Sequence, residues 1–282
     1  MNLKNAQIVN QSNNSTINLT NSQFKECSNN NLQDEGGVVY NNGGKIISSN
    51  NLYESNFVKV AGGVIYNKEG GNVSFDSDIF SRNSAIEELG GAIYSTGNLA
   101  ISKTDFTENS ANKGGGAIYI SGVAKITESD FNKNFLTGSG IGGAIYNSSN
   151  DLVITDSNFV NNYINGSLSS GGAIFNEGTL NLIAKNNPFK IEGNEVEKGQ
   201  GGAIFNKGLL TLTANDKGFE FLGNRASFGG AIYNEGTAIL QNANIFNNIS
   251  YSGSGGAISN VQGDMTISDS SFSTNSVMSG SK

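Results

Sequence analysis

The sequence predicts an all-β fold, a single-stranded parallel β-helix of about ten coils with three strands in each coil. Three observations predict it: a repeat of roughly 27 residues, short apolar segments that alternate with period two, and a composition rich in Gly and Asn. Of 282 residues, 38 are Gly and 44 are Asn, and 36% are hydrophobic. That hydrophobic share is below the globular average, so an elongated fold with a thin core fits better than a round one.

The repeat is marked by a Gly-Gly pair followed by two small or branched apolar residues. The pair occurs nine times at intervals of 25 to 30 residues, and no change of composition interrupts the series. The second glycines are Gly37, Gly63, Gly91, Gly116, Gly143, Gly172, Gly202, Gly230 and Gly256. We therefore expect one β-helix domain over 1–282, with 1–16 as an N-terminal cap or partial coil, 17–276 as coils and 277–282 as a tail.

Each repeat contains three short apolar segments separated by Gly, Asn, Ser or Asp, which predicts three strands. The first is the Gly-Gly-Ala-Ile-Tyr-Asn segment and the second a Leu-x-Ile pair such as Leu99 and Ile101. The third centres on Phe with Asn three residues later, as at Phe106 and Asn109; Leu52 is assigned to this Phe position in its own repeat. Three such strands cannot bury a face alone, so successive coils are expected to stack on one continuous core.

The alternation in the first strand assigns side-chain directions. One column contains only β-branched aliphatic residues and is expected to point inward: Val39, Ile65, Ile93, Ile118, Ile145, Ile174, Ile204, Ile232 and Ile258. The Asn that follows two residues later in seven of nine repeats must then point inward as well. We expect the Asn columns to form amide ladders along the axis.

A leucine-rich repeat is the competing solenoid. The stretch from Ile101 to Ala111 overlays its consensus, but the segment Gly114–Gly122 is too rich in Gly and β-branched residues for the helix that this fold needs.

Composition excludes several classes of function. With no His and a single Cys27, Ser-His-Asp and Cys-His catalysis are impossible and zinc sites are not expected. No nucleotide-binding motif is present, so we expect no cofactor. The net charge of −7 disfavours nucleic acid and anionic membrane as partners. No apolar run approaches the length of a membrane span, and the N-terminus lacks a signal-peptide pattern.

Four acidic residues are expected to lie near one another on neighbouring coils: Asp105, Glu128, Asp130 and Asp156. Stacked positions one or two coils apart meet the carboxylate spacing of a glycosidase by default. A solvated acidic patch, a calcium site and an acid–base pair are all compatible with the pattern.

The residue after the inward Ile is aromatic in eight repeats and is expected to point outward: Tyr40, Tyr66, Tyr94, Tyr119, Tyr146, Phe175, Phe205 and Tyr233. An outward aromatic column is unusual on a solvated face. It is either a contact surface for a glycan or protein, or a self-stabilising ladder that the next turn partly covers.

Gly-Gly-Ala-Ile, as at Gly142–Ile145, combined with Phe-x-x-Asn, as at Phe106–Asn109, resembles the repeats of chlamydial polymorphic membrane proteins and of adhesin-like microbial surface proteins. The resemblance covers almost the whole chain. It implies a right-handed β-helix of the autotransporter-passenger type, displayed at the cell surface or extracellularly. It implies adhesion to a host or neighbouring-cell protein or glycan, and it brings no catalytic residues.

Two functions follow as expectations. The first is a non-enzymatic adhesin-like or structural module that contacts partners through its lateral faces. The alternative is a carbohydrate-active β-helix, a polysaccharide lyase or tailspike-like glycosidase. Because no Gly-Gly strand precedes Ile17 and none follows Asn275, we also expect open end coils that self-associate end to end or continue into further repeats.

Overall fold

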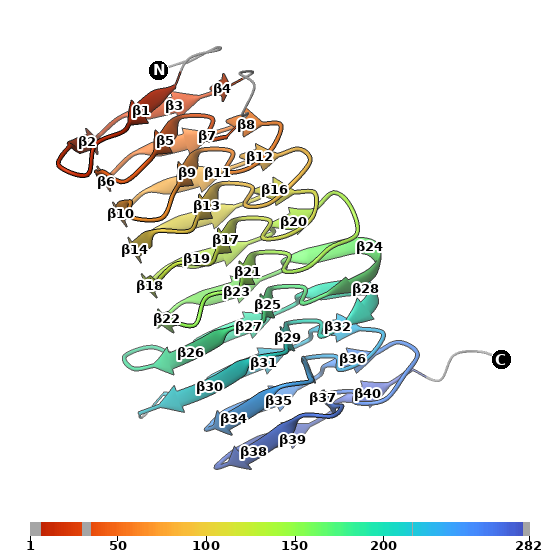
Figure 1. Cartoon of the computed structure of the whole chain (residues 1–282). Helices are drawn as coiled ribbons and strands as arrows, with labels where there is room; N and C mark the ends of the chain where they lie inside the picture. Colours follow the sequence, from red (N-terminus) through yellow and green to blue (C-terminus); the bar gives the residue numbers. More distant parts are fainter. Residues whose placement is uncertain (1–6, 30–34, 216, 279–282) are drawn as a thin grey trace.

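The structure is a computed structural model that describes residues 7–29, 35–215 and 217–278, and within these ranges it contains strands and no helix. The strands form four parallel sheets of ten strands each. Each coil contributes one strand to every sheet, and the coils stack along a single axis (Figure 1). The chain is therefore a parallel β-solenoid, and the leucine-rich repeat is excluded.

The first two sheets contain the Gly-Gly strands and the Leu-x-Ile strands. Sheet 1 consists of β1 (Ile8–Asn10), β5 (Val39–Asn41), β9 (Ile65–Asn67), β13 (Ile93–Ser95), β17 (Ile118–Ile120), β21 (Ile145–Asn147), β25 (Ile174–Asn176), β29 (Ile204–Asn206), β33 (Ile232–Asn234) and β37 (Ile258–Asn260). Sheet 2 consists of β2 (Thr16–Thr20), β6 (Lys45–Ser49), β10 (Asn72–Asp76), β14 (Asn98–Ser102), β18 (Ala124–Thr127), β22 (Leu152–Thr155), β26 (Thr179–Ala184), β30 (Leu209–Ala214), β34 (Thr237–Gln241) and β38 (Asp264–Ser268).

The other two sheets lie on either side of the Asn that follows the Phe. Sheet 3 consists of β3 (Gln23–Lys25), β7 (Leu52–Glu54), β11 (Ile79–Ser81), β15 (Asp105–Thr107), β19 (Asp130–Asn132), β23 (Asn158–Val160), β27 (Phe189–Glu192), β31 (Phe219–Leu222), β35 (Ala243–Phe246) and β39 (Ser271–Ser273). Sheet 4 consists of β4 (Ser28–Asn29), β8 (Phe57–Val58), β12 (Ser84–Ala85), β16 (Ser110–Ala111), β20 (Phe135–Leu136), β24 (Tyr163–Ser170), β28 (Glu195–Gln200), β32 (Arg225–Ala226), β36 (Ile249–Ser250) and β40 (Ser276–Val277).

The expectation of three strands per coil is wrong, because each coil has a fourth strand. That strand is two residues long in eight coils, and only β24 and β28 are longer. A two-residue strand holds one inward side chain, so period-two alternation cannot reveal it in a single repeat. Its inward residues form a small cluster of their own, made of Val58, Ala85, Ala111, Leu136, Ile164, Val196 and Ala226.

The Gly-Gly pair has a steric cause that differs between its two residues. Gly115 has a φ of 59°, in the left-handed region that favours glycine. A Cβ on Gly116 would lie 2.0 Å from the carbonyl oxygen of Gly143 in the next coil and 2.6 Å from that of Phe135. The first Gly therefore makes the turn, and the second lets neighbouring coils and the fourth strand approach closely.

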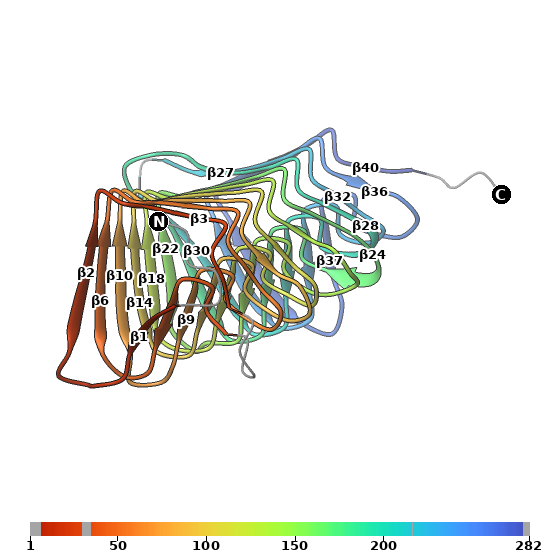
Figure 2. The same cartoon turned by 90° about the horizontal axis from the view of Figure 1, so that it is seen from above.

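The inward Ile column is confirmed. Ile93, Ile118 and Ile145 pair in register and are fully buried. The aromatic column of sheet 3 stacks beside it, with ring centroids of Phe80, Phe106 and Phe131 4.8 Å apart. Figure 2, seen from above, shows equivalent strands of successive coils lying behind one another.

The assignment of Leu52 to the Phe position is wrong by one residue. Tyr53 pairs with Phe24 and Phe80 and is fully buried, whereas Leu52 points outward. The hydroxyl of Tyr53 contacts Ser48 Oγ at 2.8 Å, which provides a buried partner for a tyrosine in a phenylalanine column.

Both Asn columns form amide ladders, as predicted. In sheet 1, Nδ2 of Asn176 donates to Oδ1 of Asn206 at 2.7 Å, and Nδ2 of Asn206 donates to Oδ1 of Asn234 at 2.7 Å. The second ladder runs between sheets 3 and 4 and links Asn56, Asn83, Asn109, Asn134, Asn162, Asn194, Asn224, Asn248 and Asn275 through bonds of 2.9 to 3.0 Å.

The first coil contains a strand that the repeat pattern did not reveal. Ile8–Asn10 forms β1, with Ile8 opposite Val39 and Asn10 opposite Asn41. The sequence signal was weak because Gln7 stands where the other repeats have Ala or Val, and Asn5-Ala6 precedes it in place of Gly-Gly. Nε2 of Gln7 donates to the carbonyl of Glu35 at 2.8 Å.

Candidate interaction surface

The outward residues of sheet 1 form an aromatic column along the solenoid. Tyr40, Tyr66, Tyr94, Tyr119 and Tyr146 are each partly exposed, and we call these five residues the tyrosine ladder. Rings of the first four are stacked at centroid distances of 4.5 to 5.7 Å. Tyr146 meets Tyr119 edge to face at 5.0 Å. Because the inner faces contact one another, the ladder presents ring edges and hydroxyls to the outside.

The last three residues of the predicted column are buried. Phe175 and Phe205 are 3% exposed and Tyr233 is 7% exposed. They form a small cluster against which Ile141 and Tyr146 pack, and Nζ of Lys207 lies 5.8 Å from the ring centroid of Phe175. These three rings are closed to a partner, so the part of the column that a partner could touch is the tyrosine ladder.

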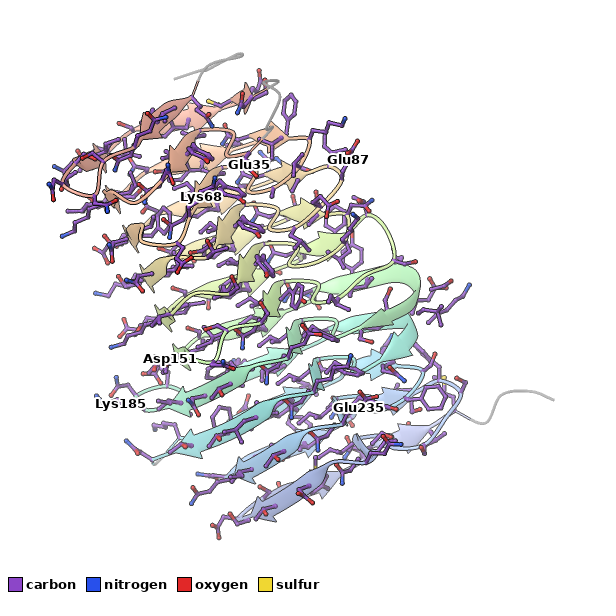
Figure 3. All side chains as sticks on the ribbon, in the orientation of Figure 1. Glu35, Lys68, Glu87, Asp151, Lys185 and Glu235 are labelled. Carbon is purple, nitrogen blue, oxygen red and sulfur yellow. The ribbon has the colours of Figure 1, made fainter. Side chains whose placement is uncertain are left out.

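Charged groups lie beside the tyrosine ladder. Nζ of Lys68 is 5.1 Å from the ring centroid of Tyr40, and the Tyr146 hydroxyl donates to the Glu177 carboxylate at 2.7 Å. Burial, followed by the Glu35 carboxylate, raises the pKa of Tyr66. Figure 3 shows Glu35 and Lys68 near one another in the N-terminal coils. The tyrosine ladder and the charged groups beside it therefore offer hydroxyls, the Lys68 ammonium group and carboxylates as hydrogen-bonding groups.

The four acidic residues divide into two pairs: Asp105 with Asp130 on sheet 3, and Glu128 with Asp156, which line one depression beside Lys185. Asp105 and Asp130 are direct register neighbours, and partial burial together with the Asp130 charge raises the pKa of Asp105. Asp156 is instead buried and accepts backbone N–H bonds from Lys185 at 2.7 Å and Asn186 at 3.1 Å. Its carboxylate therefore holds the turn between β26 and β27. Across the described residues, no group of three or more His, Cys, Asp or Glu side chains is placed to hold a metal ion.

Two segments match the family profile of the Chlamydia polymorphic membrane protein repeat, residues 103–121 and 218–235. These two segments are similar to the polymorphic membrane protein repeat. Each matched segment contains Phe-x-x-Asn, with Phe106 or Phe221, followed by Gly-Gly-Ala-Ile-Tyr. In the structure, each matched segment contains a sheet 3 strand, the bend at the ladder Asn, a sheet 4 strand and the next sheet 1 strand. No curated protein and no solved structure matched the chain significantly.

The solenoid also encloses the carboxyl group of Asp78, which the sequence pattern did not single out. Asp78 is 1% exposed, its Oδ1 accepts the backbone N–H of Asn51 at 2.7 Å, and its Oδ2 has no partner. Burial raises the pKa of Asp78 to about 6. The signal was present in the sequence, since stacked positions hold the neutral residues Thr104, Ser129 and Ser157, so an ionisable Asp stands out.

A second aromatic surface, which the sequence pattern did not reveal, lies on sheet 4. Phe135 and Tyr163 stack with a centroid distance of 5.1 Å and an interplanar angle of 2°. They start the fourth strands of their coils, so recognising them as an outward pair requires recognising those strands.

No described segment of the chain forms a helix that could cross a membrane.

Proposed function

We propose that this chain is a non-enzymatic, adhesin-like β-solenoid module of the cell surface or extracellular space. It contacts a host or neighbouring-cell protein or glycan through its lateral faces. The observation that carries this proposal is the tyrosine ladder, partly exposed over five successive coils. The repeat match, to a family described as a membrane protein of Chlamydia, supports the surface location.

The ladder suits recognition because it is rigid and amphipathic. Five rungs at about 4.8 Å per coil span roughly 19 Å, which is long enough for several sugar residues or a protein strand. Stacked tyrosines lose little conformational entropy when a partner binds, because neighbouring rings already hold them. Their hydroxyls supply directional hydrogen bonds at the edge of an apolar strip.

Non-enzymatic action is part of the proposal. A glycosidase would use two carboxylates beside a cleft, and Asp105 and Asp130 lie directly opposite each other on neighbouring coils. Asp130 accepts from Nδ2 of Asn158 at 2.8 Å, within a column of side-chain and backbone hydrogen bonds. This arrangement, together with the backbone-bonded Asp156, favours structural roles for the acidic residues.

Two further features belong to the proposal. The solenoid is expected to wind to the right, as the resemblance to polymorphic membrane proteins implies. The last described coil, β37 to β40, is also expected to pair with another chain, because Phe272 is 46% exposed and Ile267 is 43% exposed beside four strand edges.

Footprinting on target cells tests the proposal. The purified chain is bound to mammalian epithelial cells, and its tyrosines are modified by brief radical oxidation before and after binding. We expect the rate of oxidation at Tyr66, Tyr94 and Tyr119 to fall severalfold on binding, while Tyr251, which directly follows the sheet 4 strand β36, keeps its rate. Equal oxidation of the ladder in bound and unbound chain would contradict contact through this face.

A further inference from the structure

The outward column of sheet 4 has a gap in front of its aromatic pair. In register, this column reads Phe57, Ser84, Ser110, Phe135 and Tyr163. Tyr163 covers one face of the Phe135 ring. The neighbour on the other side is Ser110, whose short side chain donates to Oγ of Ser84 at 3.1 Å. A serine cannot cover a ring, so the second face of Phe135 lacks a stacking partner within the column.

A depression occupies this position. It has a volume of 440 Å³ and is lined by Arg82, Glu108, Ser110, Lys133, Phe135 and Tyr163. We call it the Phe135 notch. Its floor is the Ser110 strand, one wall is the aromatic ring of Phe135, and its rim is formed by side chains from the bends that precede the fourth strands.

The rim offers both donors and acceptors. Arg82, Glu108 and Lys133 occupy equivalent positions in three successive coils, each with positive φ directly before a ladder Asn. The second ladder fixes these bends, since Asn83, Asn109 and Asn134 are bonded to one another. Arg82 is held by an ion pair to Glu54. Burial, followed by the charge of the Glu108 carboxylate, raises the pKa of Tyr163.

We infer that the Phe135 notch binds a neutral pyranose residue of a glycan. A pyranose has an apolar C–H face that fits the uncovered ring of Phe135, and its edge carries hydroxyls that need both donors and acceptors. Lys133 donates, Glu108 accepts, and the Ser110 hydroxyl does both. This site is on sheet 4, away from the tyrosine ladder, and the inference rests on the proposed surface role only in taking a glycan as partner.

The charges of the rim select the class of sugar. Glu108 and the Glu54 partner of Arg82 place carboxylates on the same side as the two cations. The carboxylates of the rim would therefore repel an anionic sugar while the cations attract it. A neutral hexose can instead donate hydrogen bonds to the carboxylates and accept them from the cations. The proposed ligand is a neutral hexopyranose, and acidic sugars are the contrasting case.

The test uses the whole chain and a panel of immobilised oligosaccharides that end in glucose, galactose, mannose or sialic acid. The key variant is Ser110→Phe, which extends the aromatic stack and fills the notch from a position where Phe135 already shows that a ring fits. We expect wild type to bind at least one neutral hexose and Ser110→Phe to lose roughly tenfold or more in affinity. Thermal unfolding checks that the variant stays folded. The bound oligosaccharides should also be recovered at their original length, as expected for binding without hydrolysis.

A matched variant separates this inference from the general proposal. Ser276→Phe makes the same change in the same outward column, in the last described coil, and should leave hexose binding unchanged. Tyr94→Ser alters the tyrosine ladder and is compared with Ser110→Phe for cell adhesion. Absence of binding to all neutral hexoses, preference for sialylated ends, or full binding by Ser110→Phe would each overturn the inference. If cell adhesion nevertheless persists in Ser110→Phe and falls in Tyr94→Ser, the surface role stands and the notch alone fails.

Discussion

At the residue scale, asparagine makes the bend between sheets 3 and 4 possible. Asn109 is fully buried, and its Nδ2 donates to the Phe80 carbonyl one coil back and to Oδ1 of Asn134 one coil on, at 2.9 and 3.0 Å. Its Oδ1 accepts from the backbone N–H and Nδ2 of Asn83. Every polar atom of the side chain is thus paired, which is the condition for burying an amide without penalty.

The Asn ladder between sheets 3 and 4 predicts a large loss of stability from a single substitution. Asn109→Ala removes the acceptor for both Asn83 donors and the donor to Phe80, all inside the solenoid. Because each unpaired buried group costs about 1–3 kcal/mol, we expect the free energy of unfolding to fall by about 3 kcal/mol or more. Urea titration measures it. Asn112→Ala, at a half-exposed site, is the control with an expected change within about 0.5 kcal/mol; similar losses in both variants would contradict the account of the ladder.

Asp78 predicts a dependence of stability on pH. Its pKa is about 6 in the folded chain and about 3.9 when unfolded. Below about pH 4 both states hold the proton, and as pH rises toward about 6 the unfolded chain ionises first, so stability falls. Asn51, which occupies the same position one coil earlier, donates to the Leu19 carbonyl at 2.8 Å. By register, Asn at position 78 would face the Ser48 carbonyl.

We therefore expect Asp78→Asn to stabilise the chain by about 1–3 kcal/mol at pH 8 and by much less at pH 4. Urea unfolding at the two pH values measures the difference. The exposed Asp151 supplies the control, since Asp151→Asn should change stability little at either pH. A variant at position 78 that is less stable than wild type at pH 8 would show that the ionised carboxylate is favourable where it lies.

At the element scale, the sequence predicted the parts of the coil where several side chains alternate. The Ile column of sheet 1 and both Asn ladders could be predicted because their residue types recur at fixed spacing. The fourth strand could not, because a strand such as Ser84–Ala85 offers one inward residue. The error at Leu52 has a related cause: two apolar residues stand side by side, and only pairing with Phe24 and Phe80 shows that Tyr53 is the inward one.

The candidate surfaces were predictable to different degrees for the same reason. Alternation gave the outward direction of the tyrosine ladder, but the burial of Phe175, Phe205 and Tyr233 depends on packing against Ile141, which lies before a Gly-Gly pair and outside the strand pattern. The Phe135 notch depends on the fourth strand. Asp156 was grouped with Asp105 and Asp130 because sequence spacing does not show that the turn at Lys185 closes over its carboxylate.

At the scale of the whole molecule, the stacked coils explain how a chain of low hydrophobic content can be ordered. One or two inward apolar residues per strand are enough, because each coil covers the next and the core runs continuously from Leu19 to Ile245. The same arrangement leaves long lateral faces of regular spacing. A repeat protein of this kind can vary its outward residues without disturbing the inward columns.

The exposed final coil predicts association along the axis. Light scattering should show elongated oligomers that grow with protein concentration, because open strand edges beside Phe272 can pair with another chain. Phe272→Lys should shift the distribution toward monomer, whereas Ile239→Lys, at an equally exposed site on the lateral face of sheet 2, should not. A chain that stays monomeric at high concentration would contradict end-to-end association.

The central claim, that the lateral tyrosine ladder carries partner binding, is tested most directly by adhesion of a double variant. Tyr94→Ser with Tyr119→Ser removes two stacked rings while Ile93 and Ile118 stay in the core. We expect binding to epithelial cells to fall roughly tenfold, with the melting temperature close to that of wild type. Unchanged adhesion together with a large drop in melting temperature would show instead that the ladder serves only the stability of the solenoid.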